Sequence, residues 1–109
     1  MIPEQKVKEA LKVLTDHDGE YSQTRAAHDF GLKMEKIVLA EQMLESDAKS
    51  IAAREAEAKM SSAYRQAIEQ TKEIAELDYK NRAKREAAAA IIEVWRTEQS
   101  NERAHVRAA

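Results

Sequence analysis

The sequence predicts an all-α protein: an antiparallel helical hairpin or coiled coil with a long C-terminal helix, completed by oligomerisation. First, charged residues make up 35% of the 109-residue chain, a composition typical of long helices and coiled coils. Second, twenty of the hydrophobic residues are alanines, so the chain can fill a narrow seam between helices but not a thick core. Third, no glycine or proline follows Gly31. A chain of this length has room for one domain, residues 1–109.

An N-terminal arm is expected over residues 3–45. Pro3 suits the first turn of a helix, and Glu4 lies beside the positive end of the helix dipole. Apolar residues then recur at helical spacing, namely Val7, Ala10, Leu11 and Leu14. Residues 16–20, Asp-His-Asp-Gly-Glu, are the first plausible break. A helix could equally run through them, because one interior glycine costs only about 1 kcal/mol.

The second part of the arm is predicted to be helical again, with its apolar residues spaced for one face. These residues are Phe30, Met34, Ile37, Val38 and Leu44. A turn is expected at about residues 46–50, a polar stretch in which Ser50 is a candidate N-cap for the next helix. A long helix is then predicted over residues 51–105.

Two chain paths fit these helices. In one, the arm folds back on the long helix as a hairpin; in the other, a single helix runs over residues 32–105, roughly 110 Å at 1.5 Å per residue. The hairpin is favoured because it covers the apolar stripe within the chain. Thr71 and Asp78 fall where a strict heptad seam continuing from Tyr64 requires apolar residues. We therefore expect a short bundle rather than a regular long coiled coil, and a homo-oligomer that completes its seam.

The most informative feature is an uneven distribution of charge. The net charge of the chain is −2, which gives no global attraction to nucleic acid or membranes, but residues 80–109 carry an excess of cations. At 100° per residue, five arginines of this segment fall within a strip about 60° wide and ~37 Å long. They are Arg82, Arg85, Arg96, Arg103 and Arg107. The interpretations are a solvated face with local ion pairs, a nucleic-acid contact, or a contact with an acidic protein.

The apolar residues of the same segment lie to one side of these arginines. Leu77, Ile91 and Trp95 are predicted anchors for a partner or for a second copy, with Val106 on the same side. Trp95 has two interpretations. It either closes the hydrophobic seam at the point where large apolar residues run out, or it anchors a partner, since tryptophan is enriched in interface hot spots.

The chain lacks the combinations of residues that catalysis requires. It has no cysteine, no glycine-rich phosphate loop and no serine in a glycine-rich elbow. The segment that starts at Asp16 fails the EF-hand pattern, and His17, His28 and His105 match no zinc spacing. We expect a protein that is not an enzyme and that holds no metal or cofactor.

The expected location is the cytoplasm. The first residues show no cationic segment followed by an apolar run, so no signal peptide is expected. No stretch approaches the roughly 18 apolar residues of a membrane span, so no membrane partner is expected.

Two short segments, Ile91-Ile92-Glu93-Val94-Trp95-Arg96 and Asn101-Glu102-Arg103, resemble the C-terminal part of small helical proteins of tailed phages and prophages. The similarity extends to Leu14-Thr15-Asp16 and to residues 56–64, about half of the chain in all. Proteins of this group are similar in length and are often encoded near recombination or replication genes. The resemblance implies a phage accessory protein of the host cytoplasm, and it implies no catalytic residues.

The leading functional hypothesis is a non-enzymatic accessory protein of phage DNA recombination or replication. It would oligomerise through its apolar seam and bind nucleic acid or a DNA-processing protein through the C-terminal arginines. The alternatives are a structural or assembly protein, such as a scaffold or chaperone, and an inhibitor of a host enzyme whose acidic N-terminal half mimics a polyanion.

Overall fold

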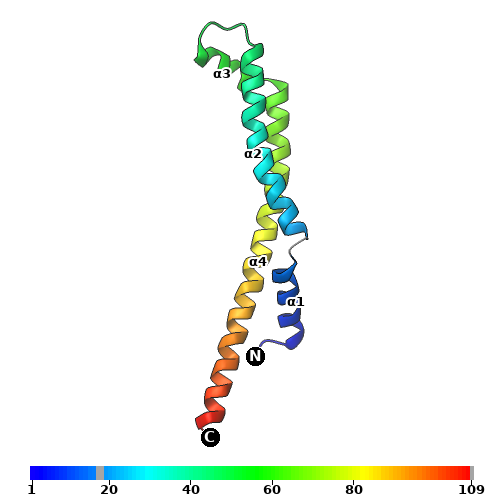
Figure 1. Cartoon of the computed structure of the whole chain (residues 1–109), viewed down its shortest axis with the longest axis vertical. Helices are drawn as coiled ribbons and strands as arrows, with labels where there is room; N and C mark the ends of the chain where they lie inside the picture. Colours follow the sequence, from blue (N-terminus) through cyan, green and yellow to red (C-terminus); the bar gives the residue numbers. More distant parts are fainter. Residues whose placement is uncertain (17–18, 109) are drawn as a thin grey trace. The chain divides into compact units, whose positions relative to one another are not determined.

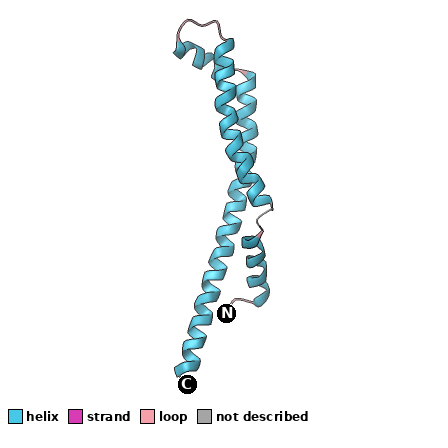
Figure 2. Cartoon of the chain, viewed as in Figure 1, coloured by secondary structure: helices cyan, strands magenta, loops and turns pink. Residues whose placement is uncertain are grey.

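The computed structural model describes residues 1–16 and 19–108, and it confirms the all-α class. Four helices follow one another: α1 (Glu4–Thr15), α2 (Glu20–Glu45), α3 (Ile51–Lys59) and α4 (Ser62–Ala108) (Figure 1). Within the described residues the remaining segments are short loops, and no strand occurs (Figure 2). His17 and Asp18, from the break predicted at residues 16–20, lie outside the described residues.

The chain divides into two compact units. The hairpin unit is Ser22–Tyr79, and the terminal unit combines Met1–Tyr21 with Lys80–Ala109. Helix α4 contributes its first part to the hairpin unit and its second part to the terminal unit.

In the hairpin unit, α2 and the first part of α4 run side by side in opposite directions, which confirms the predicted fold-back (Figure 1). The turn between α2 and α3 falls at residues 46–50. The Ser46 hydroxyl donates to the Glu57 carboxylate at 2.7 Å and accepts from the Ala48 N–H at 3.1 Å. Ser50 is the N-cap of α3, because its side chain accepts from the Ala53 N–H.

The predicted continuous helix over residues 51–105 needs correction, because it is interrupted at Met60 and Ser61. No glycine or proline marks this break. The Ser61 hydroxyl instead donates to the Ala58 carbonyl at 2.6 Å and accepts from the Tyr64 N–H at 3.2 Å. One side chain thus serves the last turn of α3 and the first turn of α4, which stabilises a break that composition does not signal.

The seam of the hairpin unit also differs from expectation. Thr71 and Asp78, predicted to interrupt it, are buried within it, with 6% and 0% of their surface exposed. The structure accommodates each of them with a matched residue on α2: Gly31 lies against Thr71, and His28 lies against Asp78. The heptad spacing therefore continues through polar residues, because their partners on α2 are small or polar.

The predicted apolar face of α2 is divided in the structure. Met34 and Val38 are half-buried, whereas Phe30, Ile37 and Leu44 are exposed. At 100° per residue, Ile37 lies about 100° from Val38 and 120° from Gly31, so these residues cannot all face α4.

In the terminal unit, α1 packs against the second part of α4. Its core consists of Val7 and Ala10 on α1 with Ala88 and Ile92 on α4. Partly buried apolar residues surround this core: Ile2, Val13, Leu14, Ile91 and Trp95. Leu11, predicted to share the apolar stripe of α1, is 45% exposed.

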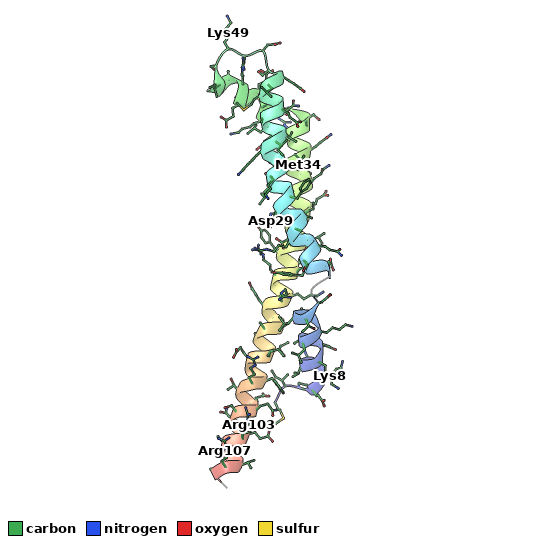
Figure 3. All side chains as sticks on the ribbon, viewed as in Figure 1. Lys8, Asp29, Met34, Lys49, Arg103 and Arg107 are labelled. Carbon is green, nitrogen blue, oxygen red and sulfur yellow. The ribbon has the colours of Figure 1, made fainter. Side chains whose placement is uncertain are left out.

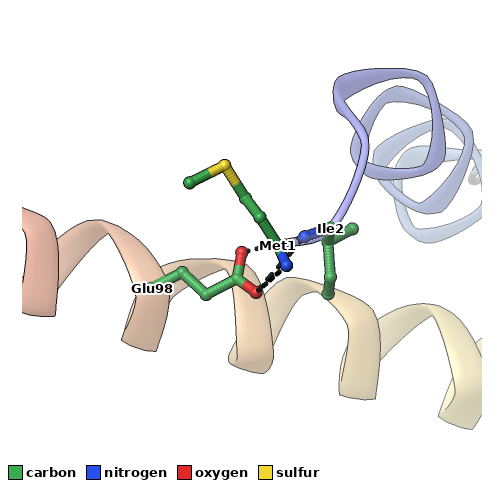
Figure 4. A network of polar contacts seen from close by, with 3 residues as sticks. All are labelled: Met1, Ile2 and Glu98. Atoms are coloured by element: carbon green, nitrogen blue, oxygen red, sulfur yellow. Dashed lines mark hydrogen bonds and ion pairs between the residues drawn. The ribbon is translucent and has the colours of Figure 1, made fainter.

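Both ends of α1 make polar contacts with α4. Near its beginning, the Ile2 N–H donates to the two carboxylate oxygens of Glu98 at 3.0 and 3.2 Å, and the Met1 amino group lies 3.7 Å from the same carboxylate (Figure 4). Near its end, the carbonyls of Val13 and Leu14 accept from Arg85 at 3.4 and 3.5 Å.

Candidate interaction surfaces

The five arginines predicted to form one cationic face have different environments. Arg96, Arg103 and Arg107 are exposed, whereas Arg82 and Arg85 are half-buried. Arg103 and Arg107 lie on the last turns of α4 (Figure 3), where every residue from Ser100 to Ala108 is exposed. Arg96 lies 3.9 Å from the carboxylate of Glu93, a contact between two well-exposed side chains that contributes little energy. The open arginine face is therefore Arg96, Arg103 and Arg107.

The placement of Arg85 on the open face needs correction. Its guanidinium carbon lies 4.5 Å from the centroid of the Tyr21 ring, which is a cation–π contact. The same guanidinium donates to the last carbonyls of α1, which have no partner within their own helix. Arg85 therefore holds α1 and Tyr21 within the terminal unit.

The heptad spacing of α4 explains the burial of Arg85. Arg85 lies seven residues after the buried Asp78 and seven before the buried Ile92, so it occupies a seam position. Arg82, Arg96 and Arg103 share another heptad position, beside the seam. In a straight helix of 3.6 residues per turn, each heptad position shifts by about 20° per heptad relative to a seam with a 3.5-residue repeat. The prediction at 100° per residue therefore placed both heptad positions on one face.

The three apolar residues predicted to anchor a partner are also separated. Ile91 and Trp95 pack against the core of the terminal unit, so they are not open anchors, and the structure supports the interpretation that Trp95 closes the seam. Their burial follows from α1, which covers this part of α4 in the terminal unit. Leu77, in the hairpin unit, is 46% exposed.

An open apolar face of the hairpin unit lies on α2. Phe30, Ile37 and Leu44 expose 65%, 48% and 82% of their surfaces and follow one another at intervals of seven residues. We call these three residues the outer stripe. Their prediction as helical residues is confirmed, but the prediction that they share one face with Met34 and Val38 is wrong. Their seven-residue spacing was the available signal for a separate face.

A shallow apolar groove adjoins the outer stripe between α2 and α4. It has a volume of about 290 Å³. Its walls include Phe30, Met34 and Val38 on α2 and Ala67, Gln70 and Ile74 on α4. Gly31 forms part of the floor: a Cβ atom there would lie 2.8 Å from the Thr71 hydroxyl, so glycine permits the close approach of the two helices.

The buried polar contact between His28 and Asp78 does not have the setting of a catalytic pair. The histidine Nδ1 lies 2.7 Å from the Asp78 carboxylate, and the ring meets Tyr79 edge to face with centroids 5.7 Å apart. Both side chains are almost fully buried in the seam, with 10% and 1% exposure, whereas a general base must reach a substrate. This geometry fits a contact that fixes the helix register.

A charged contact on α3 is local in origin. The pKa of Lys59 is raised by a hydrogen bond to Glu55 and by the charge of that carboxylate, 2.9 Å away on the open surface of α3. Among the described residues, no group of three or more potential ligands could hold a metal ion. His17 lies outside the described residues.

No helix in residues 1–16 and 19–108 combines the length and the apolar character that crossing a membrane requires. Comparisons with protein-family models, with curated proteins and with solved structures find no match to this chain. The described residues present two candidate contact surfaces, the outer stripe and the open arginine face.

Proposed function

We propose that this chain is a non-enzymatic association protein of the structural or assembly class, which pairs with a second copy of itself through the outer stripe. The observation that carries the proposal is the exposure of Phe30, Ile37 and Leu44 at heptad spacing. Helix α2 is covered by α4 on another side, so the outer stripe can receive a second helix without unfolding the hairpin unit.

The exposed area is sufficient for association of moderate strength. The exposed fractions of the outer stripe amount to about two complete side chains per copy, or about four per pair. Removing four large apolar side chains from water contributes roughly 6–12 kcal/mol, which is comparable with the 4–15 kcal/mol lost on association. We therefore expect a dimer whose population depends on protein concentration.

The test is the solution mass measured by light scattering over a concentration series. The variant Ile37→Glu places a charge in the centre of the outer stripe and is expected to give monomers with unchanged helical circular dichroism. Leu32→Glu is the matched control, because Leu32 is 45% exposed on the same helix but lies about 140° from Ile37. A mass that equals one chain at all concentrations, or equal dimers for both variants, would contradict the proposal.

A second candidate function is binding of nucleic acid through the open arginine face. It is favoured by three exposed arginines on one terminal segment of α4. The resemblance of residues 91–96 and 101–103 to phage accessory proteins supports the same candidate, in DNA recombination or replication. Such a contact weakens steeply with salt, whereas a DNA-processing protein that buries apolar surface would be less sensitive.

Fluorescence anisotropy with labelled single- and double-stranded DNA at several salt concentrations tests this candidate. Replacing Arg96, Arg103 and Arg107 together by glutamate is expected to abolish binding. The control replaces Lys6, Lys8 and Lys12, three exposed cations of α1, by glutamate, which changes the net charge equally. Equal loss in both variants would indicate a general charge effect and would exclude a site on α4.

A further inference from the structure

We infer that two copies pair antiparallel along the outer stripe, about a two-fold axis that passes beside Ile37. This inference rests on the proposed self-association and adds its direction and register. Ile37 is the centre of the stripe, with Phe30 seven residues before it and Leu44 seven residues after it. In an antiparallel two-fold pair, Phe30 therefore meets Leu44 of the partner subunit, and Ile37 meets its own counterpart.

The outer stripe forms a single narrow face. At 100° per residue, with Ile37 taken as zero, Phe30 and Leu44 lie at about 20° on either side. The residues of α2 that face α4 in the hairpin unit, such as Gly31 and His28, lie about 120–180° away. The partner helix thus reaches the stripe without displacing α4.

Charged residues beside the stripe determine the direction. Lys33 and Glu41 are exposed and lie four residues before and after Ile37, each about 40° from the centre of the stripe. In the antiparallel pair, Lys33 falls at the level of Glu41 of the partner subunit, and the two-fold axis repeats this contact. In a parallel pair, Lys33 would face lysine and Glu41 would face glutamate, which is unfavourable for both.

The next charged pair does not reverse this preference. Asp29 and Glu45 also fall at one level in the antiparallel pair, and both are acidic. They lie about 80° from the centre of the stripe, twice as far round the helix as Lys33 and Glu41, so they point past the partner helix into solvent. The pairs of Lys33 with Glu41 lie closer to the contact and therefore dominate its charge pattern.

The chain contains no cysteine, so single introduced cysteines can report the register directly. Three variants are oxidised separately and in pairs: Phe30→Cys, Ile37→Cys and Leu44→Cys. We expect Ile37→Cys to form a cross-linked dimer alone. Phe30→Cys and Leu44→Cys should cross-link only when mixed, because two copies of residue 30 lie about 21 Å apart along an antiparallel pair, far beyond disulfide reach.

The outcomes separate the register from the association itself. Efficient cross-linking of all three variants alone would show a parallel pair and would overturn the inference. If light scattering shows dimers but none of the cysteine variants cross-links, the interface lies elsewhere on the chain. That result would overturn both the register and the role of the outer stripe as the interface. Monomers at all concentrations would overturn the proposed self-association.

A charge exchange gives an independent check without cysteines. Lys33→Glu and Glu41→Lys each place like charges together in the antiparallel pair, and each is expected to weaken dimerisation roughly 3- to 30-fold at low salt. The double variant K33E/E41K restores opposite charges and should dimerise like the unmodified chain. A parallel pair already has like charges at both positions, so unchanged dimerisation in the single variants would contradict the inference.

Discussion

His28 Nδ1 lies 2.7 Å from the carboxylate of Asp78, although 50 residues separate them in the sequence. Both side chains are almost completely buried in the seam of the hairpin unit. Polar groups in such a setting are stabilised by each other rather than by water, so they specify which turn of α2 meets which turn of α4.

We expect the replacement of either partner to destabilise the hairpin unit. His28→Ala or Asp78→Ala should lower the free energy of unfolding by about 3 kcal/mol, because each leaves a buried polar group without this contact. The double variant should lose less than the sum of the two, with a coupling of about 1–3 kcal/mol in urea unfolding. Strictly additive losses would show that the two side chains do not stabilise each other.

The close approach at Gly31 gives a prediction in which two effects compete. Gly31→Ala gains about 1 kcal/mol of helix propensity, but its Cβ would lie 2.8 Å from the Thr71 hydroxyl, and overpacking costs about 1–3 kcal/mol. We expect a net loss of roughly 1 kcal/mol in thermal unfolding. In the background of Thr71→Ala the overlap disappears, so the same substitution should stabilise the chain. A stabilising effect in both backgrounds would argue against a close contact.

The role of Arg85 can be measured by hydrogen exchange. Arg85→Ala removes the cation–π contact with Tyr21 and the hydrogen bonds to the last carbonyls of α1. We expect amide exchange in α1 to accelerate roughly 5- to 30-fold, which corresponds to about 1–2 kcal/mol. Arg96→Ala is the matched control, since Arg96 is exposed. If the amides of α1 exchange at the same rate in both variants, Arg85 does not stabilise α1.

Ser61 is predicted to maintain the break between α3 and α4. Ser61→Ala removes the bond to the Ala58 carbonyl and the cap on the Tyr64 N–H, and should lower the free energy of unfolding by about 1 kcal/mol. Ser61→Asp keeps the acceptor for the N–H and should retain part of this stability. Ser62→Ala, at the neighbouring exposed position, should have little effect. If the two alanine variants behave alike in urea unfolding, Ser61 does not act as a cap.

The helices and the first turn could be predicted because their signals are local. Pro3 lies at the N-cap position of α1 and Glu4 is its first residue, and Ser50 caps α3 as its position after a polar stretch predicted. The break at Met60 and Ser61 was not predicted, because no glycine or proline marks it and alanine-rich sequence continues on both sides.

The seam and the surfaces depend on contacts between segments far apart in the sequence. Thr71 and Asp78 are suited to a seam only because α2 supplies Gly31 and His28 opposite them. Arg85 does not lie on the open arginine face, because its guanidinium donates to carbonyls at the end of α1. In each case the sequence identifies the residue type, and the partner segment determines whether the side chain is buried or open.

The small number of large apolar side chains buried in the two units has a thermodynamic consequence. Among the described residues, the buried hydrophobic set is limited to Val7, Ala10, Ala58, Ala88 and Ile92, whereas the buried polar set includes Thr71 and Asp78. Exposure of apolar surface raises the heat capacity on unfolding and exposure of polar surface lowers it. Calorimetry should therefore give a heat-capacity change well below the roughly 12–15 cal/mol/K per residue of ordinary globular domains. The stability curve of this protein should be correspondingly flat, with little loss on cooling.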